Sequence, residues 1–425
     1  MKKFLALLLS LVMVLGLAAC GSDSSTATPP AEGEGQEEPA DTGADIKIGL
    51  ICVHDINSGY DAAHIEGLKA ACKELGIDPE DQSKLVMKYN IPEDETCKDT
   101  AVDLAEQGCT IIFSDSYGHQ SYMLDAASEY PEVTFVAATG DQAGVAGLDN
   151  FKNIFTNVYE SRYVSGIVAG MKLKELMDAG TVTDPYIGYV GAFPYAEVVS
   201  GYTAFFLGIQ SIVPEAHMDV QYTNSWYDPV AEGEAANALM ARGCVIIGQH
   251  ADSTGAPSAV QAAQDGGAVV YSVGYNIDML SVAKTAALTS AQNNWSVLYK
   301  ATLEKFIAGE EIPHDYATGA KDNAVMISAL GESCAEGTQE AVDAAWAAIK
   351  DGSLKVFDTS KFTVDGKALD SYDVNLSIID FSTGNVIFEG ATENVIKDGA
   401  FEESVIRSAP YFDLRIDGIT ELNNN

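Results

Sequence analysis

Positively charged residues are scarce in this sequence. Its 425 residues include 24 lysines and arginines against 62 aspartates and glutamates, so the formal net charge is −38. Proteins that bind nucleic acid neutralise phosphates with basic side chains, and proteins held electrostatically on an anionic bilayer need the same charge. The composition therefore argues against a nucleic-acid partner and against electrostatic docking on a membrane.

The sequence also lacks the short motifs of common catalytic and metal sites. It contains no Gly-x-x-x-x-Gly-Lys-Ser/Thr loop, no Gly-x-Gly-x-x-Gly, no His-Glu-x-x-His and no Gly-x-Ser-x-Gly. No Cys-x-x-Cys pair and no Cys/His cluster has the spacing of a zinc site. His54-Asp55 and His64-Ile65-Glu66 leave acid–base chemistry open, but a structural or ligand-contacting histidine is the better explanation. We expect a binding protein without a cofactor or metal, not an enzyme.

The beginning of the chain has the pattern of a secretory signal. Two lysines precede an apolar run over 4–17, and small residues follow up to Cys20. This run is too short for a stable membrane span. The ending Leu-Ala-Ala-Cys resembles a lipobox, which implies a signal peptide and lipobox over 1–20 with Cys20 as the lipidated residue. The alternative is an ordinary secreted protein whose signal happens to end at a cysteine.

Residues 21–45 contain no aromatic residue, no basic residue and no aliphatic residue larger than alanine. Such a segment cannot bury enough apolar surface to fold, and its like charges keep it extended. We therefore expect a disordered tether that holds a folded body at the extracytoplasmic face of the cell membrane.

Six cysteines remain after Cys20, at positions 52, 72, 97, 109, 244 and 334. An even number outside the cell favours disulfides. However, Cys52, Cys109 and Cys244 lie in or begin apolar, strand-like runs, where cysteine behaves as a small buried hydrophobe. We favour free thiols, with disulfides as the alternative.

From residue 46 onward, short apolar runs alternate with helical patterns. The runs that we expect to be strands cover 46–53, 85–90, 109–114, 133–138, 186–190, 219–223, 244–248, 269–273 and 286–290. Strands alternating with helices predict an α/β fold with parallel sheets covered on both faces. The length favours two lobes. We place the first α/β lobe at 46–156 and 284–330, and the second at 157–283 and 331–425 with a C-terminal extension from 367.

Ligands of open parallel sheets bind beyond the carboxyl ends of the strands. Aromatic and hydrogen-bonding side chains follow nearly every predicted strand. Small polar residues also form turns and caps, which accounts for part of this pattern but not for its aromatic members. Aromatic rings with carboxylates and amides suit a flat, polar, uncharged ligand. The candidates are Asp55, Tyr60, Ser114, Tyr117, Phe193, Trp226, Asp252, Asn276 and Asp278.

Several segments together resemble the BMP (basic membrane protein) family of substrate-binding lipoproteins of ABC transporters, which includes purine-nucleoside binders. The matching segments are 58–67, 162–170, 187–193, 225–229, 249–252, 272–278, 288–290 and 352–357. The resemblance implies the type I periplasmic-binding fold, with two doubly wound parallel-sheet lobes joined by three crossovers.

The resemblance also implies roles for individual residues. Tyr60 and Trp226 take the places of the two rings that sandwich the purine. Asp61 replaces the asparagine that follows the first ring. Asp278, assisted by Asn276, corresponds to the group that holds ribose hydroxyls, and a carboxylate suits this because it can accept two hydrogen bonds. The lysine that nucleoside binders carry after Leu-Thr-Ser is absent, since Gln292 to Trp295 stand there; this leaves the identity of the ligand open.

We therefore expect an extracytoplasmic, monomeric, lipid-anchored protein that captures a purine nucleoside-like solute by hinge closure and delivers it to an ABC permease. Two alternatives remain. A receptor subunit of the same fold would signal to a membrane sensor instead. An anchored nucleoside hydrolase would need a water activated by carboxylates or a metal.

Overall fold

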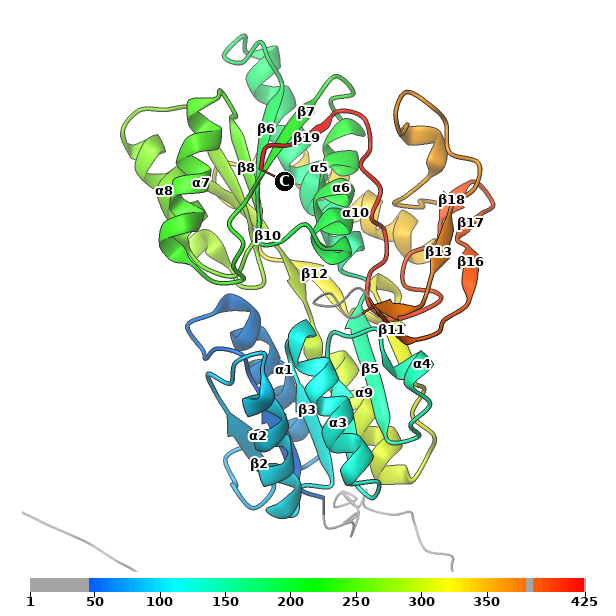
Figure 1. Ribbon diagram of the computed structural model, residues 1–425. Helices are drawn as coiled ribbons and strands as arrows, with labels where there is room; N and C mark the ends of the chain where they lie inside the picture. Colours follow the sequence, from blue (N-terminus) through cyan, green and yellow to red (C-terminus); the bar gives the residue numbers. More distant parts are fainter. Residues whose placement is uncertain (1–45, 380–384, 424–425) are drawn as a thin grey trace, which may run out of the picture. The chain divides into compact units, whose positions relative to one another are not determined.

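Two β-sheets, each between two layers of helices, dominate the computed structural model, which describes residues 46–379 and 385–423 (Figure 1). These residues belong to one compact unit. Cys20, the predicted signal peptide and the predicted tether lie outside them. No helix of the described part is long and apolar enough to cross a membrane.

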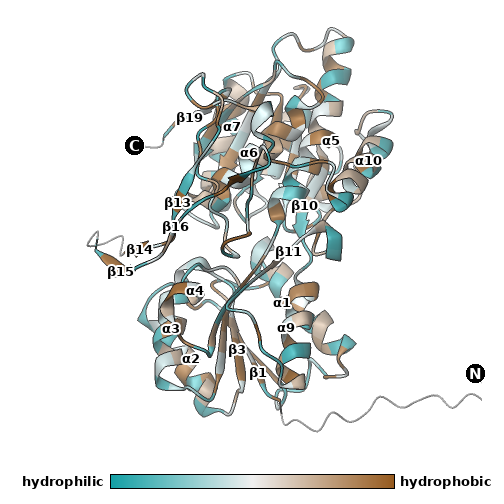
Figure 2. Ribbon diagram, turned by 90° about the vertical axis from the view of Figure 1, so that its right-hand side faces the viewer, coloured by the Kyte–Doolittle hydropathy of each residue, from teal (hydrophilic) through white to brown (hydrophobic). Residues whose placement is uncertain are grey.

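The first sheet has the strand order β11-β5-β4-β3-β1-β2, and all its pairings are parallel. Its strands are β1 (Ile48–Ile51), β2 (Leu85–Lys88), β3 (Ile111–Ser114), β4 (Thr134–Ala137), β5 (Phe151–Thr156) and β11 (Asp315–Thr318). Helices cover both faces, as Figure 2 shows. On one face lie α1 (Gly59–Glu74) and α9 (Trp295–Ala308), and on the other α2 (Glu95–Glu106) and α3 (Gln120–Glu129); the short α4 (Ala143–Ala146) follows β4.

The second sheet has the order β12-β10-β9-β8-β6-β7-β19, parallel except where β12 joins β10. Its strands are β6 (Tyr186–Gly191), β7 (His217–Tyr222), β8 (Ile246–His250), β9 (Tyr271–Tyr275), β10 (Ala287–Asn293), β12 (Val325–Ile327) and β19 (Ile419–Glu421). The helices that pack on it are α5 (Val158–Asp178), α6 (Ala196–Gln210) and α10 (Thr338–Asp351) in one layer, and α7 (Pro229–Ala241) and α8 (Gly255–Asp265) in the other.

The predicted α/β class with parallel sheets is confirmed. The chain crosses between the sheets after β5, after β10 and between β11 and β12. The range 284–330, expected in the first lobe, differs at two strands, because β10 and β12 both belong to the second sheet. β10 pairs with β9, so 287–293 lies in the second sheet, and the chain returns to the first only at α9. The sequence of β10 could not show to which sheet the strand belongs, because both sheets bury apolar runs of this kind.

The local sequence explains where the two site-bearing helices begin. The hydroxyl of Ser58 accepts a hydrogen bond from the amide of Asp61 and thereby caps α1. The carboxylate of Asp228 accepts the amides of Val230 and Ala231 at the start of α7, next to a proline in the first turn. Both caps lie just past the carboxyl end of a strand, so they fix the loops that face the other lobe.

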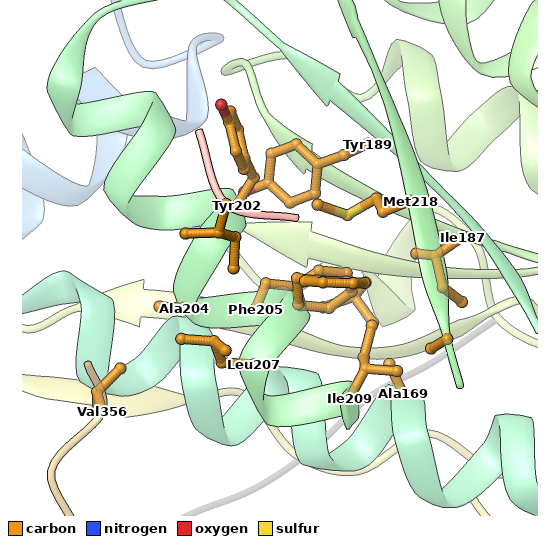
Figure 3. Packing of buried hydrophobic residues seen from close by; sticks show 14 of the residues in the cluster. Ala169, Ile187, Tyr189, Tyr202, Ala204, Phe205, Leu207, Ile209, Met218 and Val356 are labelled. Carbon is orange, nitrogen blue, oxygen red and sulfur yellow. The ribbon is translucent and has the colours of Figure 1, made fainter. Parts of the chain in front are cut away.

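The core of the second lobe depends on the close approach of α5 and α6. A Cβ atom on Gly166 would lie 2.1 Å from the carbonyl oxygen of Phe205, which leaves room only for glycine. The inward side chains of α6 then meet the sheet, and Figure 3 shows Phe205 with Tyr189 and Met218. The rings of Phe205 and Tyr189 have centroids 5.6 Å apart. This packing holds the strand ends that carry the second half of the site.

The C-terminal tail, residues 367–379 and 385–423, adds short hairpins beside the second lobe. Its paired strands are β13 (Asp373–Asn375) with β16 (Thr392–Asn394), β14 (Ile378–Ile379) with β15 (Val386–Phe388), and β17 (Ile396–Lys397) with β18 (Ala400–Phe401). The six cysteines of the described part are free thiols, and all except Cys334 are fully buried.

Candidate ligand-binding site

A narrow cleft lies where the carboxyl ends of the two sheets face each other. The first lobe contributes Val53, Tyr60, Ser116, Tyr117 and Thr139; the second contributes Glu197, Trp226, His250, Asp252 and Tyr275. Both lobes therefore supply aromatic and polar groups to one space.

Tyr60, in the first turn of α1, forms a fixed aromatic wall on the first lobe. Its hydroxyl lies 2.6 Å from the hydroxyl of Thr139 after β4. Its ring meets His64 edge-on at 4.5 Å and Trp295 edge-on at 6.2 Å. With polar tip and ring edges both held, the ring needs little further ordering to stack on a ligand.

Trp226, in the loop after β7, forms the aromatic wall on the second lobe. Its ring contacts Phe193 at 5.2 Å and Tyr195 at 6.1 Å between centroids. Phe193 in turn stacks on Tyr195 at 5.0 Å. Phe193 thus supports Trp226 from behind and lines a wider outer hollow rather than the inner cleft.

Two carboxyl groups of the second lobe reach the cleft. Burial raises the pKa of Glu197 to about 7, against the opposing effect of Arg162. Burial, then the charges of Glu232 and other carboxylates, raise the pKa of Asp252 well above its usual range. Asn276 donates its amide to Asp252 at 2.9 Å and orients it. A carboxyl group that keeps its proton can donate as well as accept, which suits ligand hydroxyls.

Arg162 of α5 lies buried beneath the cleft floor. Its guanidinium carbon lies 3.6 Å from the centroid of the Tyr275 ring, and Nη1 donates to the carbonyl of Gln249 at 2.6 Å. Burial, and then Arg162, lower the pKa of His250 well below its usual range, so the imidazole is neutral. Nε2 of His250 lies 3.2 Å from Oε1 of Glu197. The cation thus supports the floor from behind and does not enter the cleft.

The structure brings together only part of the predicted set. Tyr60, Tyr117, Trp226 and Asp252 line the cleft, while Phe193 and Asn276 support two of them. The other four candidates lie outside the lining. Asp61 accepts the amide of His54 at 2.8 Å, Ser114 is buried in β3, Asp55 accepts the amide of Asn57 at 2.9 Å, and Asp278 accepts the amide of Leu280 at 2.9 Å.

Six lining residues are absent from the predicted set (Val53, Ser116, Thr139, Glu197, His250 and Tyr275), and Glu197 is the one among them with a carboxyl group. It lies in the first turn of α6, beyond the loop that follows β6. The candidates from the sequence stand directly after predicted strands, and Glu197 lies one loop further along the chain. An acidic residue in the first turn of a helix that follows a strand was the available signal.

One cluster of the described residues has ligand atoms close enough for a metal: Cys52, Asp61 and Asp115, within 4.8 Å of one another. Burial, and then Asp61, raise the pKa of Asp115 well above its usual range. The amide of Val53 donates to Asp115 at 3.0 Å. Two facing buried carboxyl groups that share a proton account for this arrangement, and we assign no metal to it.

Known proteins are similar to this chain over most of its length. Residues 46–359 match a family described as PnrA-like ABC transporter substrate-binding proteins. A purine-binding protein of Brucella abortus is 29% identical over 73% of this chain and 83% of its own. A Haloferax volcanii protein, named for glucose binding by an ABC transporter, is 28% identical over 81% of this chain and 82% of its own.

Among solved structures, a solute-binding protein of an ABC transporter from Aeropyrum pernix superposes with a TM-score of 0.61. It is 16% identical, and the match covers 73% of this chain and 93% of that one. At this identity the likeness concerns the fold alone.

Proposed function

Because the chain belongs to the Bmp family of ABC transporter substrate-binding proteins, we propose that it captures a purine nucleoside-like solute in the cleft between its lobes. Such proteins are extracytoplasmic solute-binding components that deliver their ligand to a permease. The proposal adds the ligand class, capture by closure, and a lipid anchor at Cys20.

The observation that carries the proposal is the placement of Tyr60 and Trp226. They come from different lobes and line the same cleft. A flat base between two rings gains about 1–3 kcal/mol per stacked ring. Neither lobe alone presents both rings, so the stacking favours the closed arrangement.

The polar groups of the second lobe suit the sugar of a nucleoside. Asp252, oriented by Asn276, and Glu197, paired with His250, offer carboxyl oxygens to hydroxyl groups. We assign this role to Asp252 and Glu197 rather than to Asp278, whose carboxylate caps a 3₁₀ turn on the exposed side of the loop. The purine-binding relative supports a base as the stacked part.

A second candidate is a free sugar. Aromatic rings with nearby carboxyl groups also suit a pyranose, and one relative is named for glucose binding. A sugar would use the carboxyl groups but would need only one ring. Whether binding affinity depends on one ring or on both therefore separates the two candidates.

Closure follows from contacts that span both lobes. A ligand held by Tyr60 and Trp226 stabilises the arrangement in which the lobes meet, and the three crossings act as the hinge. The closed form then docks on an ABC permease as a monomer. The anchor at Cys20 keeps the protein near that permease.

The test is a thermal-shift and calorimetric screen of residues 42–425, the compact unit, with purine nucleosides, free bases, glucose and amino acids. A ligand at ~100 times its dissociation constant adds about 2.7 kcal/mol to the free energy of unfolding. We expect stabilisation by adenosine or guanosine that is lost in Trp226→Ala.

Trp346→Ala is the matched control, because Trp346 lies on α10 and outside the cleft. A shift with glucose but not with nucleosides would contradict the nucleoside assignment. Chromatography of the same mixtures should show intact nucleoside; release of free base would identify a hydrolase instead.

A further inference from the structure

The C-terminal tail lies beyond residue 359, where the family match ends. We propose that Arg407 of this tail is a positioning residue for the ligand site: it holds Asp141, which holds Tyr117 in the cleft, and it thereby couples ligand binding to the contact between the lobes. The inference rests on the proposed ligand cleft and adds a residue and an element that this function did not include.

The tail is built into the second lobe. Its last strand, β19, pairs with β7 at the edge of the second sheet. The rings of Phe412 and Phe357 stack at 4.3 Å. The hydroxyl of Tyr202 on α6 donates to Glu421 at 2.9 Å. These contacts make the tail move with the second lobe.

The same tail contacts the first lobe. Nη1 of Arg407 lies 3.2 Å from Oδ2 of Asp141, which follows β4. The amide and hydroxyl of Ser408 donate to Oδ1 of Asp315 on β11, at 3.0 and 2.9 Å. Phe388 packs against the apolar cluster between the first sheet and α2 and α3. Figure 1 shows the tail reaching β11 and α4 from the side of the second lobe.

The seam between Arg407 and Asp141 is largely withdrawn from water. The side chains retain 16% and 8% of their exposure, so the pair is only weakly screened. Removing one partner would leave the other charge poorly solvated, which costs more than loss of an exposed pair.

Asp141 connects this seam to the cleft. Its Oδ2 also accepts the hydroxyl of Tyr117 at 3.0 Å, and its Oδ1 accepts the amide of Gln120 at 3.1 Å. Tyr117 lines the cleft opposite Trp226 and Asp252. Arg407 therefore holds the Asp141 carboxylate, which in turn holds the Tyr117 ring. Arg407 itself does not line the inner cleft.

The tail also forms one wall of the cleft mouth. A wider outer hollow shares Tyr117, Glu197 and Trp226 with the inner cleft. Its remaining lining includes tail residues Ile378, Ile379, Arg407 and Pro410. A ligand entering by this route passes the tail.

The seam and the ligand join the same two lobes, so each lowers the cost of forming the other, and the coupling is reciprocal. Such couplings change affinity by about 5–150-fold. We expect Arg407→Gln to weaken adenosine or guanosine binding roughly tenfold, within that range. Asp141→Asn should have the same effect.

The experiment is a double-mutant cycle on residues 42–425, read by calorimetry with adenosine and guanosine and by small-angle scattering without ligand. The double variant should bind about as weakly as either single variant, because each breaks the same connection. Arg407→Lys should retain most of the affinity. Without ligand, Arg407→Gln should have a larger radius of gyration than the unmodified protein.

Lys397→Gln is the matched control, because Lys397 pairs with Glu402 inside the tail at 3.4 Å. It should leave both affinity and radius unchanged. Affinity within twofold of the unmodified protein in Arg407→Gln, or additive effects in the cycle, would overturn the inference. If neither nucleoside binds, the nucleoside proposal fails. The scattering measurement needs no ligand, so an unchanged radius of gyration in Arg407→Gln would still overturn the inference that Arg407 holds the lobes together.

Discussion

The backbone amide of Gly59 on the first lobe donates to the carbonyl of Asp252 on the second, over 2.9 Å. This hydrogen bond joins the start of α1 to the loop after β8. It lies next to the Tyr60 ring and the Asp252 carboxyl group, both of which we assign to ligand binding. The approach is tight at Gly59: a Cβ there would lie 3.3 Å from the carbonyl oxygen of Asp252, so the neighbouring loop would have to shift by a few tenths of an ångström. We infer that the closeness of the lobes depends on the space that the residue before Tyr60 takes up.

A graded series at Gly59 tests this dependence. Gly59→Ala should weaken ligand binding by a few-fold and Gly59→Val by at least tenfold, because the added atoms separate the lobes at the cleft. The ligand-free midpoint of unfolding should change little, since the contact lies between lobes and not within a core. Calorimetry with the ligand and melting without it check both parts. Equal affinities across the series would contradict the assignment of this contact to the binding-competent state.

Asp252 should discriminate between a nucleoside and its free base. In Asp252→Ala, we expect the affinity for the nucleoside to fall about 10–100-fold, since a buried ligand hydroxyl left without its partner costs about 1–3 kcal/mol. The affinity for the free base should change much less, because the base contacts the two rings. Titration of both ligands into both proteins gives the ratio.

Asp278→Ala is the control for this experiment. Its carboxylate caps the turn at Leu280, so the substitution removes a nearby carboxyl group without touching the cleft lining. A loss of nucleoside affinity in Asp278→Ala that matches the loss in Asp252→Ala would restore the residue that the sequence resemblance favoured.

The family and the α/β fold were predictable from the sequence, and both are confirmed. Strands and helices were predictable because each has a short-range periodicity of apolar residues that can be read from the sequence. The two sandwiching rings were also predictable as candidates, because bulky aromatic residues in loops after strands have no structural reason of their own. Their roles in binding stay predictions.

Asp252 was among the candidates from the sequence, but Glu197 was not, and the sequence could not show that Asp252 lines the cleft while Asp278 does not. Asn276 has a left-handed φ of 63°, and the chain turns there, so Asn276 faces the cleft floor and Asp278 lies exposed. A backbone turn of this kind decides side-chain direction without a periodic signal. The tail could not be interpreted either, because the partners of Arg407 and Ser408 are about a hundred residues or more away in sequence and the intervening chain gives no pattern.

Glu197 should make the stability of the ligand-free protein depend on pH. Its pKa is about 7 in the folded state, above the ordinary value of 4.5. The unfolded chain therefore loses its proton first as the pH rises, so the free energy of unfolding should fall between about pH 4.5 and 7 and level off above. Each unit of pKa difference corresponds to about 1.4 kcal/mol, so Glu197 contributes a fall of roughly 3 kcal/mol.

Glu197→Gln removes the ionisable group and keeps its shape and its contact with His250. Chemical denaturation at pH 5 and at pH 8 should show a smaller loss of stability in this variant than in the unmodified protein. Glu232, with a pKa of about 7 from burial, retains its own share, so the dependence should shrink and not vanish. Glu215→Gln, at an exposed position, should leave the difference between the two pH values as it was. An undiminished fall in Glu197→Gln would mean that Glu197 is already ionised in the folded cleft, and its hydrogen bonds to a ligand would then be those of an acceptor only.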